Sequence, residues 1–322
     1  MKIGKLPNDI LKNEILSKIN IDNRDVLVGP GIGEDCSIID FGEEKCVITT
    51  DPITGATNEI GSLSVHISCN DIASAGVKPI GVMVTILAPK DSTINDIKKV
   101  MDDIVSTCST LSVQVLGGHT EVTDAVNKMI VSITAIGKGK DIVTTSGAKL
   151  NDDIVVTGYA GLEGTVIIAS DRKEIISKHF SSSEIESMLS MMKSISVVET
   201  GLLAAKFKVN SMHDATEGGV LGAIYEVGEA SGLKVKVFED RIPIKEETKK
   251  VSKIFNIDPY RLISSGSMII TTDRGEELCT YLKSNGINSS VVGKITNEEN
   301  ILIKNGQSIS LNGPEVDEIY KI

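Results

Sequence analysis

Tryptophan is absent from this chain of 322 residues, and aromatic residues of all kinds make up only 3% of it. A core built on large rings is therefore excluded. Apolar residues still account for 41% of the sequence, so Ile, Val, Leu and Met must supply the buried interior. A chain of this length is expected to fold as about two domains.

Positive charge is also scarce. The sequence has 33 Lys and Arg residues against 44 Asp and Glu residues, which leaves a formal net charge of -11. Such a surface repels nucleic acid and anionic membranes, and the chain has no basic run of the kind that binds nucleic acid. We therefore expect neither nucleic acid nor a membrane as a partner. A phosphate-rich ligand would need cations to dock among these carboxylates.

Long apolar runs and paired cysteines are missing as well. The longest apolar runs, such as residues 80–88, are much shorter than a bilayer span. The five cysteines form no Cys-x-x-Cys pair and have no histidine spacing suited to zinc. Together with the lack of a signal peptide, this pattern predicts reduced thiols and a cytoplasmic protein.

The apolar pattern divides the chain into two mixed blocks. The clearest helix is predicted over 92–111, where apolar residues recur at spacings of three and four. The segment 137–150 has no long apolar pattern and separates the blocks. We therefore predict an α+β fold of two domains, residues 1–145 and 146–322. Other predicted elements of the first block are helices at 7–19 and 61–75 and strands at 46–51, 80–87, 113–116 and 129–136.

Acidic residues next to glycine or threonine stand at positions that resemble loops or strand ends. An unpaired carboxylate is costly to bury, and several that converge beside flexible turns suggest ligands of a hard cation. Mg²⁺ held by a few carboxylates and substrate phosphates is the commonest such arrangement. The pattern therefore predicts a nucleotide bridged by metal. The residues are Asp35, Asp51, Asp71, Glu121 and Asp214.

Three of these acids lie in the first part of the chain, each with a simpler alternative explanation. The glycine-rich run 29–33 before Asp35 lets backbone N–H groups approach a ligand, yet it is no Walker A loop and a plain turn also explains it. Asp51 follows Thr50 at a strand end, where α/β sheets often carry sites, but it also suits a turn before proline. His66 and Asn70 share a helix face, with Asp71 beside Asn70, which suits either a metal-binding face or a polar helix end.

Two glycine-containing segments carry the remaining acids. Gly117-Gly-His-Thr-Glu121 follows an apolar strand, and its glycines permit close backbone approach, although His119 also suits a hydrogen-bonded loop. Asp214-Ala-Thr-Glu-Gly-Gly219 opens a helix predicted over 217–229, where an anion is favoured and Thr216 can be the N-cap. Two glycines in a first helical turn are costly unless something packs closely against them.

Eight segments, in this order, resemble the AIR synthase (PurM-like) ATP-binding superfamily over nearly the whole chain. The resemblance is closest to its hydrogenase-maturation branch, the HypE proteins; other branches are AIR synthetase, selenophosphate synthetase and thiamine-monophosphate kinase. The segments are Gly31–Asp35, Thr50-Asp51, Val65–Asp71, Ala75–Pro79, Gly117–Thr120, Asp214–Gly219, Glu229–Gly232 and Ile257–Tyr260.

The resemblance implies a fold and a ligand set. The fold is PurM-like, with an N-terminal domain that contributes strands to a β-barrel shared between the subunits of a homodimer and a C-terminal α+β sandwich. ATP binds near that interface. Mg²⁺ is implied on Asp35, Asp51, Asp71 and Asp214, with Glu121 a weaker candidate. Nucleotide-binding positions are implied at Gly31, Gly33, Thr50, Asn70, Gly117, Gly118, Thr120, Thr216, Gly218 and Gly219.

The implied activity is the phosphorylation or activation of a small acceptor by the γ-phosphate of ATP, as in a phosphotransferase or an ATP-driven dehydratase or ligase. Two alternatives stay open: a kinase resembling thiamine-monophosphate kinase, and a non-catalytic nucleotide-binding maturation or sensor protein. His119 and Lys5 are candidate catalytic residues.

The chain departs from the HypE pattern at three places. It ends at Ile322 without a cysteine, so self-dehydration of a modified C-terminal cysteine is not expected. Glu217 replaces an arginine, and Ser264-Ser265 replaces an Asn-Glu pair.

Overall fold

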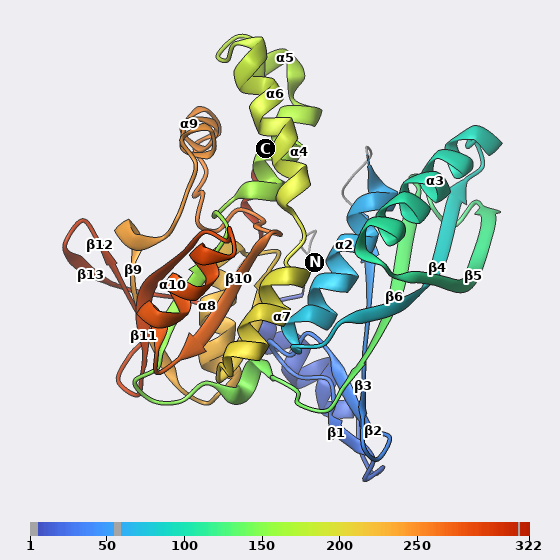
Figure 1. Ribbon diagram of the computed structural model, residues 1–322. Helices are drawn as coiled ribbons and strands as arrows, with labels where there is room; N and C mark the ends of the chain where they lie inside the picture. The colour runs from blue at the N-terminus through green and yellow to red at the C-terminus, as the bar shows by residue number, and fades with distance from the viewer. Residues whose placement is uncertain (1–5, 55–58, 315) are drawn as a thin grey trace.

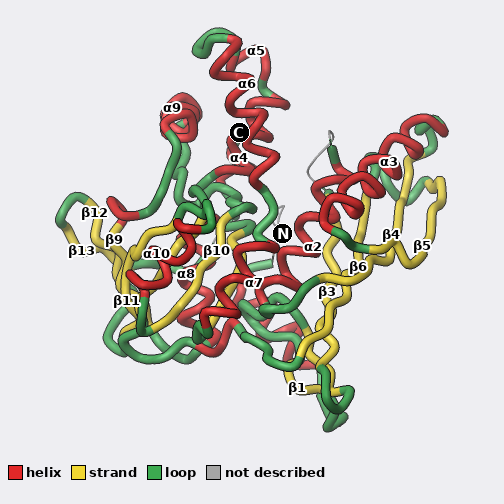
Figure 2. Tube along the Cα trace, in the orientation of Figure 1, coloured by secondary structure: helices red, strands yellow, loops and turns green. Residues whose placement is uncertain are grey.

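The computed structural model describes residues 6–54, 59–314 and 316–322, and its strands form two sheets (Figures 1 and 2). The first sheet has six strands in the order β1-β2-β3-β6-β4-β5. Neighbouring strands are antiparallel except β4 and β5, which are parallel. The strands are β1 Val26–Val28, β2 Ser37–Asp40, β3 Lys45–Ile53, β4 Pro79–Pro89, β5 Gln114–Thr123 and β6 Ile130–Gly139.

The second sheet has seven strands in the order β13-β12-β9-β11-β7-β10-β8. Among the described strands of this second sheet, only β9 and β12 pair in parallel, and the other neighbours are antiparallel. With the first sheet it makes a mixed α+β fold of two sheets with helices. The strands are β7 Asp153–Thr157, β8 Ser211–Ala215, β9 Lys234–Phe238, β10 Ser267–Thr272, β11 Ser289–Thr296, β12 Ile301–Lys304 and β13 Gln307–Ser310.

Helices cover the sheets and join the two halves. In Figure 1, α2 and α3 lie along the first sheet, α2 also faces α7, and α4 to α6 form a projection beside the C-terminus. The longer helices are α2 Ile60–Ser74, α3 Ile94–Leu111, α4 Leu162–Asp171, α6 Ser182–Ser190, α7 Val198–Phe207, α8 Gly219–Ala230, α9 Glu246–Phe255 and α10 Gly275–Ser284. Shorter ones are α1 Asn8–Ile10 and α5 Lys173–Ile176.

The first core shows how sequence pattern becomes packing. Alternate residues of β6, Val131, Ile133 and Ala135, are fully buried and belong to the same core as Ile72 of α2. Burying a side chain such as Ile133 contributes roughly 1.5–3 kcal/mol. Because α2 packs between this sheet and α7, nearly all of its residues are buried, including the polar Asn70 and Asp71.

The strongest sequence patterns predicted their elements well. The helix expected over 92–111 is α3, which begins after Thr93 because the Thr93 and Asp96 side chains form a reciprocal capping box. The helix expected over 61–75 is α2, which ends before Gly76 in the left-handed conformation (φ 76°). The helix expected over 7–19 is instead a short α1 followed by π and 3₁₀ turns to Lys18.

Two local expectations were wrong. The segment 117–121 is not a loop after a strand, because β5 continues through it to Thr123, paired in parallel with β4. Thr216 is not the N-cap of α8, since that helix starts later and its N-cap is Gly218, with φ 86°. The short strands β1, β2, β12 and β13 were not predicted.

Within the described residues, no single helix is long and apolar enough to cross a membrane. The bent pair Ser182–Ser194 and Val198–Phe207 meets that length and composition only when its two halves are taken together. All five cysteines are free thiols.

Candidate functional site

A cleft of about 1070 Å³ opens between the two halves of the chain. The first half lines it with the loop before β2, the end of β3 and one face of α2. The second half contributes α4, the end of β8, the turn that follows β8, and the C-terminal segment. Among the described lining residues, the Lys and Arg side chains are those of Lys128 and Arg172, whereas acidic residues line the cleft from both halves.

Four aspartates from four different elements meet in this cleft. Asp35 comes from the β1–β2 connection, Asp51 from β3, Asp71 from α2 and Asp214 from β8. Asp71 is 5% exposed, and the hydroxyl of Thr49 donates a hydrogen bond of 2.7 Å to its Oδ2. Burial raises the pKa of Asp71 well above its usual value, and the charges of Asp214, Asp51 and Asp35 raise it further. The four neighbouring carboxyl groups therefore repel one another when they are charged, and a bound cation would relieve that repulsion.

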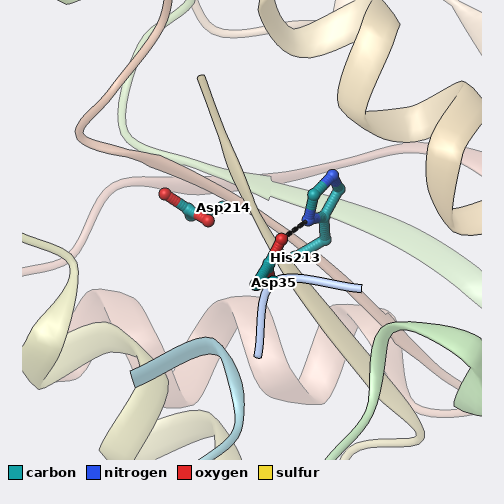
Figure 3. Close-up of side chains that lie close together, drawn as sticks. All are labelled: Asp35, His213 and Asp214. Carbon is teal, nitrogen blue, oxygen red and sulfur yellow. Dashed lines mark ion pairs between the residues drawn. The ribbon is translucent and has the colours of Figure 1, made fainter. Parts of the chain in front are cut away.

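A buried histidine holds one member of this group. Nδ1 of His213 lies 2.6 Å from Oδ1 of Asp35, and its Nε2 lies 3.1 Å from Oε2 of Glu226 on α8. Figure 3 shows the Asp35 carboxylate pointing at the near nitrogen of the ring, with Asp214 alongside. Burial opposes protonation, but Asp35 and Glu226 together raise the pKa of His213 well above its usual value. The two carboxylates therefore favour the protonated, imidazolium form of His213.

The donor set suits a hard cation. One ligand atom each from Asp35, His213 and Asp214 lies within 4.8 Å of the others, but His213 already pairs with Asp35. Asp35 Oδ2 is buried and has no hydrogen-bond partner among the described residues. Carboxylate oxygens in excess, one of them unsatisfied, fit Mg²⁺ better than a softer metal.

The structure brings many of the predicted ligand-binding residues together. Gly31, Gly33, Thr50 and Thr216 line the cleft with the four aspartates. Asn70 does not line it: its amide accepts from Val197 N–H at 2.8 Å and donates to the Ile195 carbonyl at 2.9 Å, which ties α2 to the segment before α7.

Gly218 and Gly219 also lie outside the cleft lining and serve close packing. The Gly218 N–H donates to Asp317 Oδ2 at 2.7 Å. A Cβ on Gly219 would lie 2.5 Å from the carbonyl oxygen of Tyr260. The close packing that two glycines in this turn led us to expect is therefore present.

The predicted residues 117–121 do not line the cleft of the described chain. They lie on β5, the outermost strand of the first sheet, where His119 and Glu121 are exposed and face each other at 3.1 Å. A Cβ on Gly118 would lie 1.8 Å from the Val84 carbonyl oxygen, so the pairing of β4 and β5 requires glycine there. Lys5 lies outside the described residues.

Three residues of the site were not among the sequence candidates. His213 directly precedes Asp214 on a predicted strand, which was a usable signal, whereas Glu226 and Glu163 gave none. Both glutamates belong to helices, and only the fold shows that they face the cleft.

Models of AIR synthase related proteins match most of the chain. The N-terminal domain of that family matches residues 33–138, and its C-terminal domain matches residues 150–304. The chain belongs to the AIR synthase-related family. The first match contains β2 to β5 and nearly all of β6, and the second contains β7 to β12.

Individual AIR synthase-related proteins are similar over much of the chain. A putative hydrogenase expression/formation protein of Methanocaldococcus jannaschii is 28% identical over 92% of this chain and 89% of its own length. The carbamoyl dehydratase HypE of Bradyrhizobium diazoefficiens is 24% identical over 74% of this chain and 69% of its own length.

Solved structures share the fold. HypE in a complex with HypF has a TM-score of 0.77 at 21% identity, covering 94% of this chain and 99% of that one. A ThiL protein complexed with AMPPCP and TMP has a TM-score of 0.75 at 16% identity, covering 97% and 99%. HypE in complex with ATP has a TM-score of 0.73 at 18% identity, covering 98% and 97%.

Proposed function

We propose that this protein binds Mg-ATP in the cleft and uses the γ-phosphate to phosphorylate or activate a small acceptor. The observation that carries the proposal is the convergence of Asp35, Asp51, Asp71 and Asp214 on one cleft. Two further findings support it: the family membership, and the shared fold with proteins crystallised with ATP or AMPPCP.

The four aspartates are the residues that would hold the metal. Bound Mg²⁺ would neutralise charge on both the carboxylates and the phosphates, which is the main need in phosphoryl transfer. Thr49 orients Asp71 through its hydroxyl, and His213 orients Asp35. Gly31 and Gly33 line the same cleft and leave their backbone open to a phosphate.

We further propose that the chain has two domains, with the boundary near residues 145 and 146. We also propose that the first sheet forms the interface of a homodimer. The outer strand β5 exposes Leu116 (57%) and Val122 (55%), apolar side chains on an edge open to pairing. A second copy paired here would place four residues of β5 at the interface between subunits: Gly117, Gly118, Thr120 and Glu121. The predicted role of these residues in nucleotide binding requires such a position, because ATP is expected near that interface. Leu116→Asp is expected to give monomers by light scattering, while Leu189→Asp on α6 leaves the mass unchanged.

A kinase acting like thiamine-monophosphate kinase is the second candidate, because a ThiL structure shares the fold across nearly its whole length. The relatives named carbamoyl dehydratase favour a different use of ATP, in which water leaves the acceptor. A non-catalytic nucleotide sensor is the third candidate.

One experiment separates these functions. Calorimetry measures Mg-ATP binding, and ADP and inorganic phosphate are then assayed with a panel of acceptors that includes thiamine monophosphate. Acceptor-stimulated ADP without free phosphate indicates a kinase, and ADP with equimolar phosphate indicates a dehydratase or ligase. Binding with no turnover indicates a sensor, and no Mg-ATP binding refutes the proposal.

A further inference from the structure

Glu163 is a buried acid in the cleft that the metal site does not use. It lies in the first turn of α4, lines the cleft and is only 2% exposed. Its Oε2 is buried and has no hydrogen-bond partner among the described residues, nor does any ion pair there include it. Leaving such a buried group without a hydrogen-bond partner is destabilising, and more so when the group is charged.

The neighbouring acids are already engaged. Asp317 accepts hydrogen bonds from the N–H groups of Gly218, Ile263 and Ile319. Glu217 accepts one from the Tyr320 hydroxyl at 3.2 Å. Among the acids on this side of the cleft, the buried oxygen without a hydrogen-bond partner in the described chain is therefore Oε2 of Glu163.

The backbone holds Glu163 in place. The Gly161 N–H donates to Ser264 Oγ at 2.8 Å, and the Gly164 N–H donates to the Ile263 carbonyl at 3.1 Å. Ser264 N–H in turn donates to the Thr216 carbonyl at 3.3 Å. The first turn of α4 is thus fastened to the loop that follows Asp214, and Glu163 has a fixed position relative to the aspartate cluster.

We propose that Glu163 binds the acceptor by accepting hydrogen bonds from a positively charged nitrogen group, such as an ammonium or guanidinium. This proposal rests on the proposed function, because it names the chemistry of the acceptor. An anion would meet Glu163, Glu217 and Asp317 together, which disfavours it.

The surroundings fit a cation on an alkyl chain. Ile167, Ile168 and Ile263 line the cleft beside the acids and can pack against methylene groups. The nearby Arg172 donates to the Ile322 carbonyl at 2.7 Å. Burial also raises the pKa of Glu163 to about 7, so a bound cation would draw this side chain to its charged form.

The test uses four probes with the same butyl chain: butylguanidinium, butylammonium, butanol and butyrate. Their binding is measured by calorimetry on the full chain, first without nucleotide and then with Mg-AMPPCP. We expect the two cations to bind the wild-type protein and to bind Glu163→Gln at least about tenfold more weakly, because the variant loses one charge-assisted hydrogen bond. Glu186→Gln, an exposed change of the same charge on α6, should leave their affinity unchanged.

Other results would overturn the inference. These are cation affinity that Glu163→Gln leaves intact, or butyrate binding as tightly as the cations. If Glu163→Gln does not fold, the wild-type comparison still decides, because equal binding of butylammonium and butanol rules out a carboxylate partner. Cation binding that depends on Glu163 in a protein that does not bind Mg-AMPPCP would support the recognition while refuting the ATP proposal.

Discussion

Nδ1 of His213 lies 2.6 Å from Oδ1 of Asp35, and this contact joins the two halves of the chain in the lining of the cleft. The two side chains are 6% and 10% exposed, so water screens their interaction poorly. The Asn8 amide donates to Glu226, the second partner of His213, at 3.3 Å. His213 of β8 therefore joins the loop before β2 to α8, and Glu226 extends the connection to the N-terminal turn.

Replacing His213 by Gln is expected to destabilise the protein. The change leaves Asp35 and Glu226 buried without the cation between them, and breaking such a buried pair costs about 3–5 kcal/mol. Urea unfolding measures the loss. The exposed His179→Gln should change stability by less than about 0.5 kcal/mol. Equal stability of the two variants would show that His213 is not charged in the folded protein.

Replacing Asp71 by Asn is expected to weaken Mg-ATP binding by at least about tenfold, since a neutral amide is a poorer Mg²⁺ ligand than a carboxylate. Calorimetry against Mg-ATP measures the change. Asp102→Asn, an exposed position on α3 outside the cleft, serves as the matched control. Unchanged affinity in Asp71→Asn would contradict the assignment of the metal site.

Glu163→Gln is expected to stabilise the ligand-free protein above neutral pH. The folded-state pKa of about 7 lies above the ordinary value of 4.5 for a glutamate, so between these values the unfolded chain loses its proton first and stability falls as pH rises. Below pH 4.5 the ionisation of Glu163 does not change the free energy of unfolding. Above pH 7 it lowers the free energy of unfolding by up to about 3 kcal/mol, at about 1.4 kcal/mol per pKa unit.

Urea unfolding of both proteins at pH 5 and pH 8 tests this. The difference between Glu163→Gln and wild type should grow in favour of the variant at pH 8. Burial raises the pKa of Asp317 to about 6. Because Asp317 titrates in both proteins, its contribution to the pH dependence of stability largely cancels from the comparison. A difference that is the same at both pH values would mean that the pKa of Glu163 is not raised.

Gly118→Ala is expected to destabilise the first sheet more than Gly117→Ala does. Both glycines have φ near +150°, so alanine is strained at either position. A Cβ at Gly118 would also meet the Val84 carbonyl at 1.8 Å, whereas one at Gly117 meets nothing within 4 Å. The extra cost should be about 1–3 kcal/mol by urea unfolding. If Gly117→Ala weakens Mg-ATP binding while staying more stable than Gly118→Ala, the nucleotide role predicted for this segment gains support.

Strong periodicity and local stop signals made the larger elements predictable. The apolar repeat of α3 and the left-handed glycine after α2 depend only on neighbouring residues. The extent of β5 was not predictable in this way. Its glycines disfavour a strand locally, and parallel pairing with β4 overrides that preference.

The sequence by itself determined which residues have the chemistry for the site: aspartates beside glycine or threonine, in the order that marks the AIR synthase-related family. It also determined the acidic balance that makes a cation necessary for a phosphate ligand. Only the tertiary structure decided which of these residues meet. Asp35 and His213 come together, Asn70 joins α2 to the second half, and the first turn of α4, which carries Glu163, is hydrogen-bonded to the loop at 262–265. Contacts between segments far apart in the chain depend on how sheets and helices pack, and local sequence pattern does not contain that information.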